Sequence, residues 1–202
     1  MVLERCPIRQ LPQRPITTEH ERFRLTVVSI FAVDEPVDLV VEAAKNLPEV
    51  EFHILGDPQR AAPGLVAAAP KNVHFPGFLG GNEYWELLCG SNAVMTLTSE
   101  PMSLVSGGVE SMALGRPTIV SRQQTLTDYF TKGTVFVEHS AASITAGIQT
   151  AQIQENRLTH EIRELAVEKQ RRWLQEIQAL RNTITAAARH PTPLLHQREQ
   201  RH

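Results

Sequence analysis

The sequence of 202 residues lacks the features that mark several classes of protein. It has two cysteines, Cys6 and Cys89, which are too few and too far apart for a disulfide-stabilised scaffold. No apolar run approaches the roughly 18 to 20 residues of a membrane-spanning helix. No dense basic segment occurs and the formal net charge is −2, so nothing in the charge predicts nucleic acid or an anionic membrane as a partner.

Signals for secretion, metals and redox cofactors are missing too. Residues 1–24 carry prolines and arginines without the apolar core of a secretory signal, and we interpret them as a linker or partly ordered segment in a cytoplasmic protein. The eight histidines form no ligand cluster, so no metal is expected. The first predicted strand runs into no G-x-G-x-x-G and no G-x-S-x-G occurs, which disfavours NAD binding and a serine nucleophile; no cofactor is expected.

Segments typical of strands alternate with segments typical of helices through the middle of the chain. The expected strands are residues 25–31, 51–55, 73–75, 93–98, 118–121 and 134–137. The expected helices are residues 36–47, a short irregular segment within 61–69, and then 83–88, one after Gly108, 125–130 and 140–154. This alternation predicts an α/β fold in which residues 25–155 form a single Rossmann-like, doubly wound parallel sheet of about six strands.

A long C-terminal helix is expected over residues 156–188. Ile162, Trp173 and Ile184 are spaced eleven apart, so the apolar stripe follows a nearly straight helix and not a heptad. Residues 158–188 would span roughly 46 Å, whereas a compact domain of this size measures about 40 Å. The helix therefore either covers another body or lies along its own sheet and frays beyond Arg181. Residues 189–202 are expected to be a disordered tail.

The segment SGGVESMALGRP, residues 106–117, is the most informative motif. A helix that begins near Ser106, Gly107 and Gly108 presents unpaired amides and a positive dipole, and both favour a phosphate. Glu110, one turn further, could accept hydrogen bonds from ribose hydroxyls. The alternative is an ordinary helix-to-strand corner in which Gly115 ends the helix.

Four segments carry a resemblance to a known family: residues 54–57, 72–79, 93–99 and 110–117. The last, ESMALGRP, is similar to the family's Glu-Ala-Met-Ala-x-Gly-x-Pro. Residues 25–181 resemble the C-terminal, donor-binding domain of retaining GT-B glycosyltransferases, which include sucrose synthases and many bacterial polysaccharide enzymes. The resemblance implies one half of a GT-B fold and a nucleotide-diphosphate sugar as donor substrate.

The resemblance also implies roles for individual residues. It places Glu110 on the ribose, the amides of Ser106, Gly107 and Gly108 on the phosphates, and Glu100 near the donor sugar. Nine residues separate Glu100 from Glu110, whereas the family has seven, and the intervening loop is rearranged.

The arginine and lysine that the family directs at the diphosphate are replaced by the segment AVDEP, residues 32–36, whose carboxylates oppose a leaving diphosphate. Compensation could come from the amides of Gly107 and Gly108, from Arg122, or from a metal held partly by Asp34.

A GT-B enzyme binds its acceptor between two Rossmann-like domains, and this sequence resembles only the donor half. We therefore expect transfer of a hexosyl group only when the chain joins an acceptor-binding domain or subunit, with the C-terminal helix making that contact or a homo-oligomeric one. Two alternatives stay open: a non-catalytic binding or scaffold module that has lost the diphosphate-binding cations, and half of a sugar-nucleotide epimerase.

Overall fold

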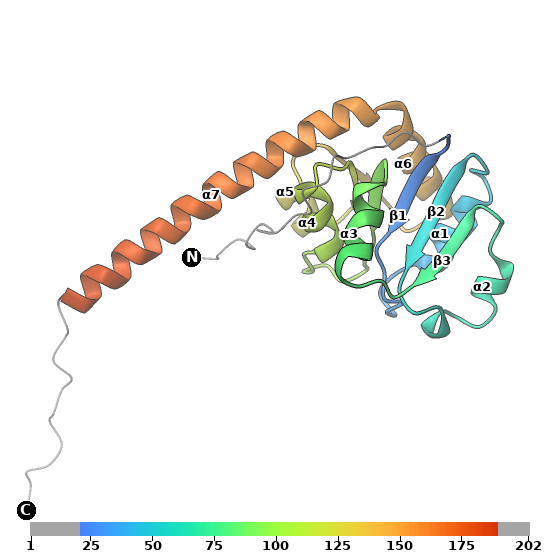
Figure 1. Cartoon of the computed structure of the whole chain (residues 1–202), viewed down its shortest axis with the longest axis horizontal. Helices are drawn as coiled ribbons and strands as arrows, with labels where there is room; N and C mark the ends of the chain where they lie inside the picture. Colours follow the sequence, from blue (N-terminus) through green and yellow to red (C-terminus); the bar gives the residue numbers. More distant parts are fainter. Residues whose placement is uncertain (1–20, 190–202) are drawn as a thin grey trace, which may run out of the picture.

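The computed structural model describes residues 21–189, and its centre is a six-stranded sheet (Figure 1). The strands are β1 Phe23–Val27, β2 Val50–Leu55, β3 Val73–Gly77, β4 Ala93–Thr96, β5 Thr118–Ser121 and β6 Thr134–Val137. Their order across the sheet is β3-β2-β1-β4-β5-β6, and every neighbouring pair is parallel. The predicted doubly wound α/β sheet is confirmed.

Helices cover both faces of the sheet. They are α1 Val37–Ala44, α2 Leu65–Ala68, α3 Gly81–Cys89, α4 Ser106–Ala113, α5 Gln124–Tyr129, α6 Ala141–Ile153 and α7 Glu155–Arg189, with a 3-10 turn at Pro58–Arg60. One apolar core joins α1 and α6 to one face of the sheet. On the other face, one cluster includes α3 and a second cluster includes α4, α5 and α7. In β4, Met95 belongs to the first core and Val94 to the opposite face, which explains the nearly continuous apolar run.

The first strand is shorter than its composition predicts. It ends at Val27, and Phe31 has a φ of 56°, a left-handed conformation that does not fit a strand. The β-branched run thus continues into the loop after β1. Ser140 caps α6, because its hydroxyl accepts from the Ser143 amide at 3.2 Å.

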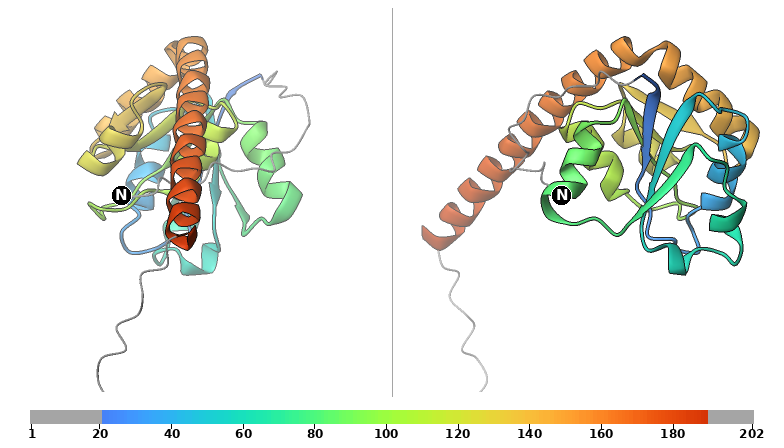
Figure 2. Two further views of the ribbon diagram at one scale, coloured as in Figure 1. Left: turned by 90° about the vertical axis from the view of Figure 1, so that its left-hand side faces the viewer. Right: turned by 45° about the vertical axis from the view of Figure 1, so that its right-hand side comes forward.

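The last helix is longer than predicted. Helix α7 has 35 residues and begins at Glu155, whose carboxylate accepts from Asn92 Nδ2 at 3.0 Å. Leu158, Ile162 and Leu165 are buried, and Leu165 is the last buried residue among those of α7 whose side chains the structure describes. Figures 1 and 2 show the second half of α7 projecting past the sheet, with no fraying at Arg181.

Two of the predicted segments lie mainly outside the described residues. The N-terminal linker was predicted over residues 1–24, of which 21–24 are described, and the tail over 189–202, of which only Arg189 is. Within residues 21–189, no helix combines the length and apolarity required to cross a membrane.

Candidate functional site

A pocket of about 270 Å³ opens where the direction of strand succession reverses, between β1 and β4. The loop after β1, the end of β4 and the start of α4 line it. The lining residues are Val28, Ser29, Ile30, Asp34, Glu35, Thr96, Leu97, Thr98, Ser103, Leu104, Val105, Ser106 and Gly107. In open parallel sheets, ligands bind at this crevice at the carboxyl ends of the strands. We call it the switch-point pocket.

Glu35 organises the loop after β1. Its Oε2 accepts hydrogen bonds from Ser29 Oγ at 2.7 Å, the Ile30 amide at 2.9 Å and the Ala32 amide at 3.0 Å. Three donors on one oxygen fix the carboxylate at the pocket wall and pair amides that the turn would otherwise leave unpaired.

Asp34 ties the same loop to the end of β4. Its Oδ2 accepts from Thr98 Oγ1 at 2.5 Å, and its carbonyl oxygen accepts from the Ser99 amide at 2.8 Å. The Thr98 hydroxyl accepts in turn from the Glu100 amide at 3.1 Å. The sequence predicted Asp34 and Glu35 to be opposing charges, with Asp34 also considered as a partial metal ligand, and this structural role was missed. Their position directly after a strand end is nevertheless typical of loop residues that pair local amides.

The two glycines of α4 are packing positions. A Cβ on Gly107 would lie 2.8 Å from Val28 Cβ, and one on Gly108 would lie 2.9 Å from Phe130 Cζ. Both glycines are buried, and only Gly107 of the pair lines the switch-point pocket. The helix itself starts without a side-chain cap, because its N-cap residue is Val105.

Glu110 points away from the pocket lining toward α3. Tyr84 Oη donates a hydrogen bond to Glu110 Oε2. Burial, and then the hydrogen bond to Glu110, raise the pKa of Tyr84, so the phenol keeps its proton as a donor. Tyr84 was missed at the sequence level, because nothing in its surroundings along the chain signals a partner 26 positions away.

The structure places Glu100 and Arg122 outside the switch-point pocket. Glu100 is exposed and does not line the pocket. Arg122, which follows β5, forms an ion pair with Glu138 at 3.1 Å and donates to the Phe136 carbonyl oxygen at 3.2 Å. Of the predicted site residues, Ser106 and Gly107 therefore meet at the pocket, whereas Gly108, Glu110, Glu100 and Arg122 lie elsewhere.

Electrostatics in the pocket are dominated by the two carboxylates. Among the described residues, its lining contains Asp34 and Glu35 but no arginine, lysine or histidine. Two like charges about 4 Å apart repel by about 4 kcal/mol at an effective dielectric constant near 20. A helix N-terminus contributes about 0.3–1 kcal/mol, and about 2 kcal/mol at most. At such a separation, the start of α4 would not offset the repulsion that these carboxylates exert on a free diphosphate.

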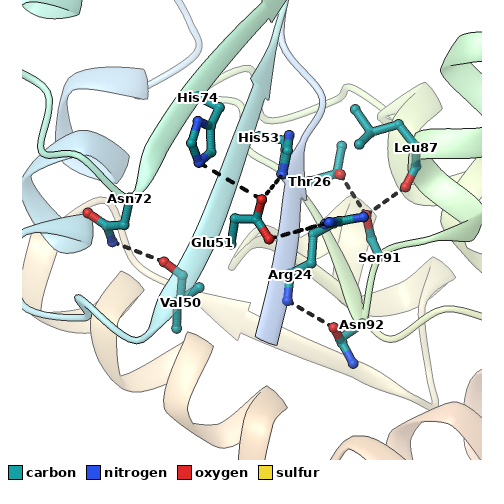
Figure 3. A network of polar contacts seen from close by, with 10 residues as sticks. All are labelled: Arg24, Thr26, Val50, Glu51, His53, Asn72, His74, Leu87, Ser91 and Asn92. Atoms are coloured by element: carbon teal, nitrogen blue, oxygen red, sulfur yellow. Dashed lines mark hydrogen bonds and ion pairs between the residues drawn. The ribbon is translucent and has the colours of Figure 1, made fainter. Parts of the chain in front are cut away.

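A second polar cluster lies near the amino ends of β1, β2 and β3 (Figure 3). Glu51 accepts from the Arg24 guanidinium at 3.4 Å and contacts His53 Nε2 at 3.0 Å, with His74 Nε2 3.9 Å away. Burial lowers the pKa of His53 against the opposing effect of Glu51, so His53 is neutral near pH 7. These groups satisfy one another across three strands, and we interpret them as a structural network.

The network borders a larger cavity of about 400 Å³, which Glu21, Arg22 and Lys71 also line. It lies at the amino ends of the strands, the opposite end from the crevice where parallel sheets bind ligands. Within residues 21–189, no group of three or more histidine, cysteine, aspartate or glutamate side chains is arranged to hold a metal ion. The switch-point pocket is therefore the better candidate, although it is smaller.

Comparison with known families gives one match that covers most of the chain. A family model described as "Glycosyl transferase-like" matches residues 37–201. The match contains α4 and its ESMALGRP motif but starts after the loop that carries Asp34 and Glu35. A search of curated proteins gives no significant match.

Several solved structures share the fold. Sucrose-phosphate synthase from Thermosynechococcus elongatus is 21% identical with a TM-score of 0.66, over 86% of this chain and 47% of that chain. HepE from Anabaena, in complex with UDP-glucose, is 14% identical with a TM-score of 0.63, over 79% and 49%. The GtfA/B complex is 17% identical with a TM-score of 0.62, over 88% and 39%. The chain thus corresponds to about half of each of these structures or less.

Proposed function

The chain belongs to the glycosyl transferase-like family, and from this premise we propose that it is the donor-binding half of a GT-B glycosyltransferase. In this proposal it binds a nucleotide-diphosphate sugar and transfers a hexosyl group to an acceptor held by another domain or subunit. The observation that carries the proposal is the switch-point pocket, which lies where such sheets bind their ligands and is bordered by the start of α4.

The donor would extend across the start of α4. Ser106 and Gly107 lie at the pocket and Glu110 one turn further along the same helix, on the side of Tyr84. Nucleotide phosphates near the first amides of α4 would gain from the helix dipole, provided that they stay clear of Asp34 and Glu35. HepE, which shares the fold, was crystallised with UDP-glucose, and this supports testing that donor first.

Titration of the full chain with UDP-, GDP- and ADP-glucose tests the proposal. We expect one of these nucleotide sugars to bind by calorimetry, and Glu110→Ala to weaken its binding by about tenfold through the loss of a charged hydrogen-bond acceptor. Glu42→Ala is the matched control, because Glu42 is an exposed carboxylate of α1 that pairs with Lys45. Equal losses in the two variants, or no binding of any nucleotide sugar, would contradict the proposal.

A second candidate is a non-catalytic binding module. Asp34 and Glu35 favour it, because the pocket they line has no cation for a leaving diphosphate among its described residues. Binding of ligands without any transferase activity, even after the acceptor half is supplied, would favour this candidate.

Helix α7 is the surface that we propose for the acceptor half. Val167, Leu174 and Ile184 are 56%, 51% and 60% exposed. Exposed apolar side chains along a projecting helix are typical of a surface that another protein covers. This chain covers 47% and 49% of two solved structures of like fold, which leaves room in a complete enzyme for such a half.

A further inference from the structure

The switch-point pocket has the dimensions of a site for one small ring. Its volume of about 270 Å³ lies just below the range of about 300–1,000 Å³ that is typical of pockets for drug-sized ligands. A nucleotide sugar is larger than such a space, so it would place one of its parts in the pocket and the rest outside it.

The chemistry of the lining decides which part. The pocket offers two carboxylates and the hydroxyls of serine and threonine, with no positively charged side chain among the described lining residues. Phosphate oxygens are acceptors and carry negative charge, so they find no charged donor here and are repelled by Asp34 and Glu35. Sugar hydroxyls are uncharged donors, and a carboxylate is the strongest acceptor that a protein offers them.

We propose that the switch-point pocket binds one uncharged hexose ring, whose hydroxyls donate to Asp34 and Glu35, and that the phosphates of any donor lie outside it. This deepens the proposed function, on which it rests for the placement of the ligand at this end of the sheet. It also assigns Asp34 and Glu35 a role in binding the sugar. In the family that the chain resembles, an arginine and a lysine contact the diphosphate instead.

Both carboxylates are held in position before a ligand arrives. Glu35 Oε2 is fixed by three donors and Asp34 Oδ2 by Thr98. Within the described part of the chain, the second oxygen of each carboxylate makes no further hydrogen bond. Neither of these oxygens is fully buried, so each can still accept a hydrogen bond from a ligand. Such preorganisation lowers the entropy that binding costs.

The proposal is tested by NMR titration of the full, isotope-labelled chain. The probes are the methyl glycosides of glucose, mannose and N-acetylglucosamine on one side and inorganic pyrophosphate on the other. We expect at least one glycoside to shift the amides of Ile30 and Thr98, which lie beside the two carboxylates, and pyrophosphate to leave these two amides unshifted.

Amide substitutions test the two negative charges while keeping the hydrogen bonds that hold the loop in place. Asp34→Asn and Glu35→Gln keep one acceptor oxygen each for the existing donors, and each is expected to weaken glycoside binding about five- to tenfold. The double variant is expected to let pyrophosphate shift the pocket amides. Glu42→Gln, which removes an exposed charge outside the pocket lining, should change neither titration. If Glu35→Gln loses its dispersed spectrum, Asp34→Asn alone decides the outcome.

Three results would overturn the proposal: no glycoside shifts the pocket amides, pyrophosphate shifts them in the unaltered chain, or the amide variants bind glycosides unchanged. Failure of the proposed function is distinguishable from these results. If glycosides bind but no nucleotide sugar does, the hexose site stands and the transferase proposal fails. If nucleotide sugars bind but glycosides and their pocket shifts are absent, the hexose site alone fails.

Discussion

The phenol of Tyr84 in α3 donates a hydrogen bond to the carboxylate of Glu110 in α4, so the acidic residue of the ESMALGRP motif already has a partner inside the domain. Tyr84 packs with the apolar cluster beneath α3 and meets Trp85 edge to face at a centroid distance of 5.1 Å. The bond connects the two helices that flank the nucleotide side of the proposed donor site. A ribose would have to share Glu110 with Tyr84 or displace it.

Tyr84→Phe removes this donor and retains the ring. We expect it to lower the free energy of unfolding by about 1.5–3 kcal/mol, the usual contribution of a hydrogen bond to a charged group. Urea unfolding measures the loss. In a double-mutant cycle, Glu110→Gln should cost less in the Tyr84→Phe background than alone, and strictly additive losses would show that the two groups are not coupled.

Gly107→Ala tests the close approach of α4 to β1. The new methyl group would lie 2.8 Å from Val28 Cβ, so α4 must move, and we expect a loss of about 1–3 kcal/mol in unfolding free energy. In a Val28→Gly background, which lacks the Cβ that the new methyl group meets, Gly107→Ala should cost less. Gly80→Ala is the control, because nothing lies within 4 Å of its Cβ position, and a loss as large as that of Gly107→Ala would contradict the packing argument.

Sequence patterns predicted the sheet well because local composition controls it. β4 is buried on both faces, and its apolar run AVMT indicates such a strand without knowledge of its neighbours. Gly115 has a φ of 67°, as expected for a glycine that ends a helix before Pro117. Both features depend on residues adjacent in the chain.

The site was less predictable because its partners come from distant segments. Asp34 meets Thr98 across 64 positions, and Tyr84 meets Glu110 across 26. The motif placed glycines at the start of α4, but whether their Cα atoms face a ligand or Val28 depends on how α4 docks against β1. No local pattern contains that information.

The network of Glu51 and His53 predicts how stability depends on pH. Burial lowers the pKa of His53 below 6.5, so the unfolded chain binds this proton first and stability falls as the pH drops below about 6.5. Although burial alone raises it, the pKa of Glu51 is lowered below 4.5, by the hydrogen bond from His53 and then by the charge of Arg24. A second loss of stability should therefore begin as the pH falls below about 4.5.

Urea unfolding at a series of pH values measures both steps. His53→Gln should flatten the dependence between pH 7 and 5, because it removes the group that titrates there, and leave the step at lower pH. His74→Gln is the control, since His74 is half exposed and its Nε2 lies 3.9 Å from Glu51 Oε1, which is too far for a hydrogen bond. An unchanged slope in His53→Gln would assign the first step to another group.

The docking of α7 on the domain depends on Gly133, which precedes β6. A Cβ at this position would lie 2.3 Å from the Ile162 nitrogen and 2.6 Å from its Cα, so the backbone of α7 lies directly on the glycine. Gly133 also has a φ of 62°, which costs any other residue about 1–2 kcal/mol. Gly133→Ala is therefore expected to lower the free energy of unfolding by about 2–5 kcal/mol, because the displaced helix loses packing in addition to the backbone cost. Gly64→Ala isolates the backbone contribution, since Gly64 has a φ of 82° with nothing within 4 Å of its Cβ position. Urea unfolding of the two variants measures the difference, and equal losses would mean that α7 yields to the methyl group without cost.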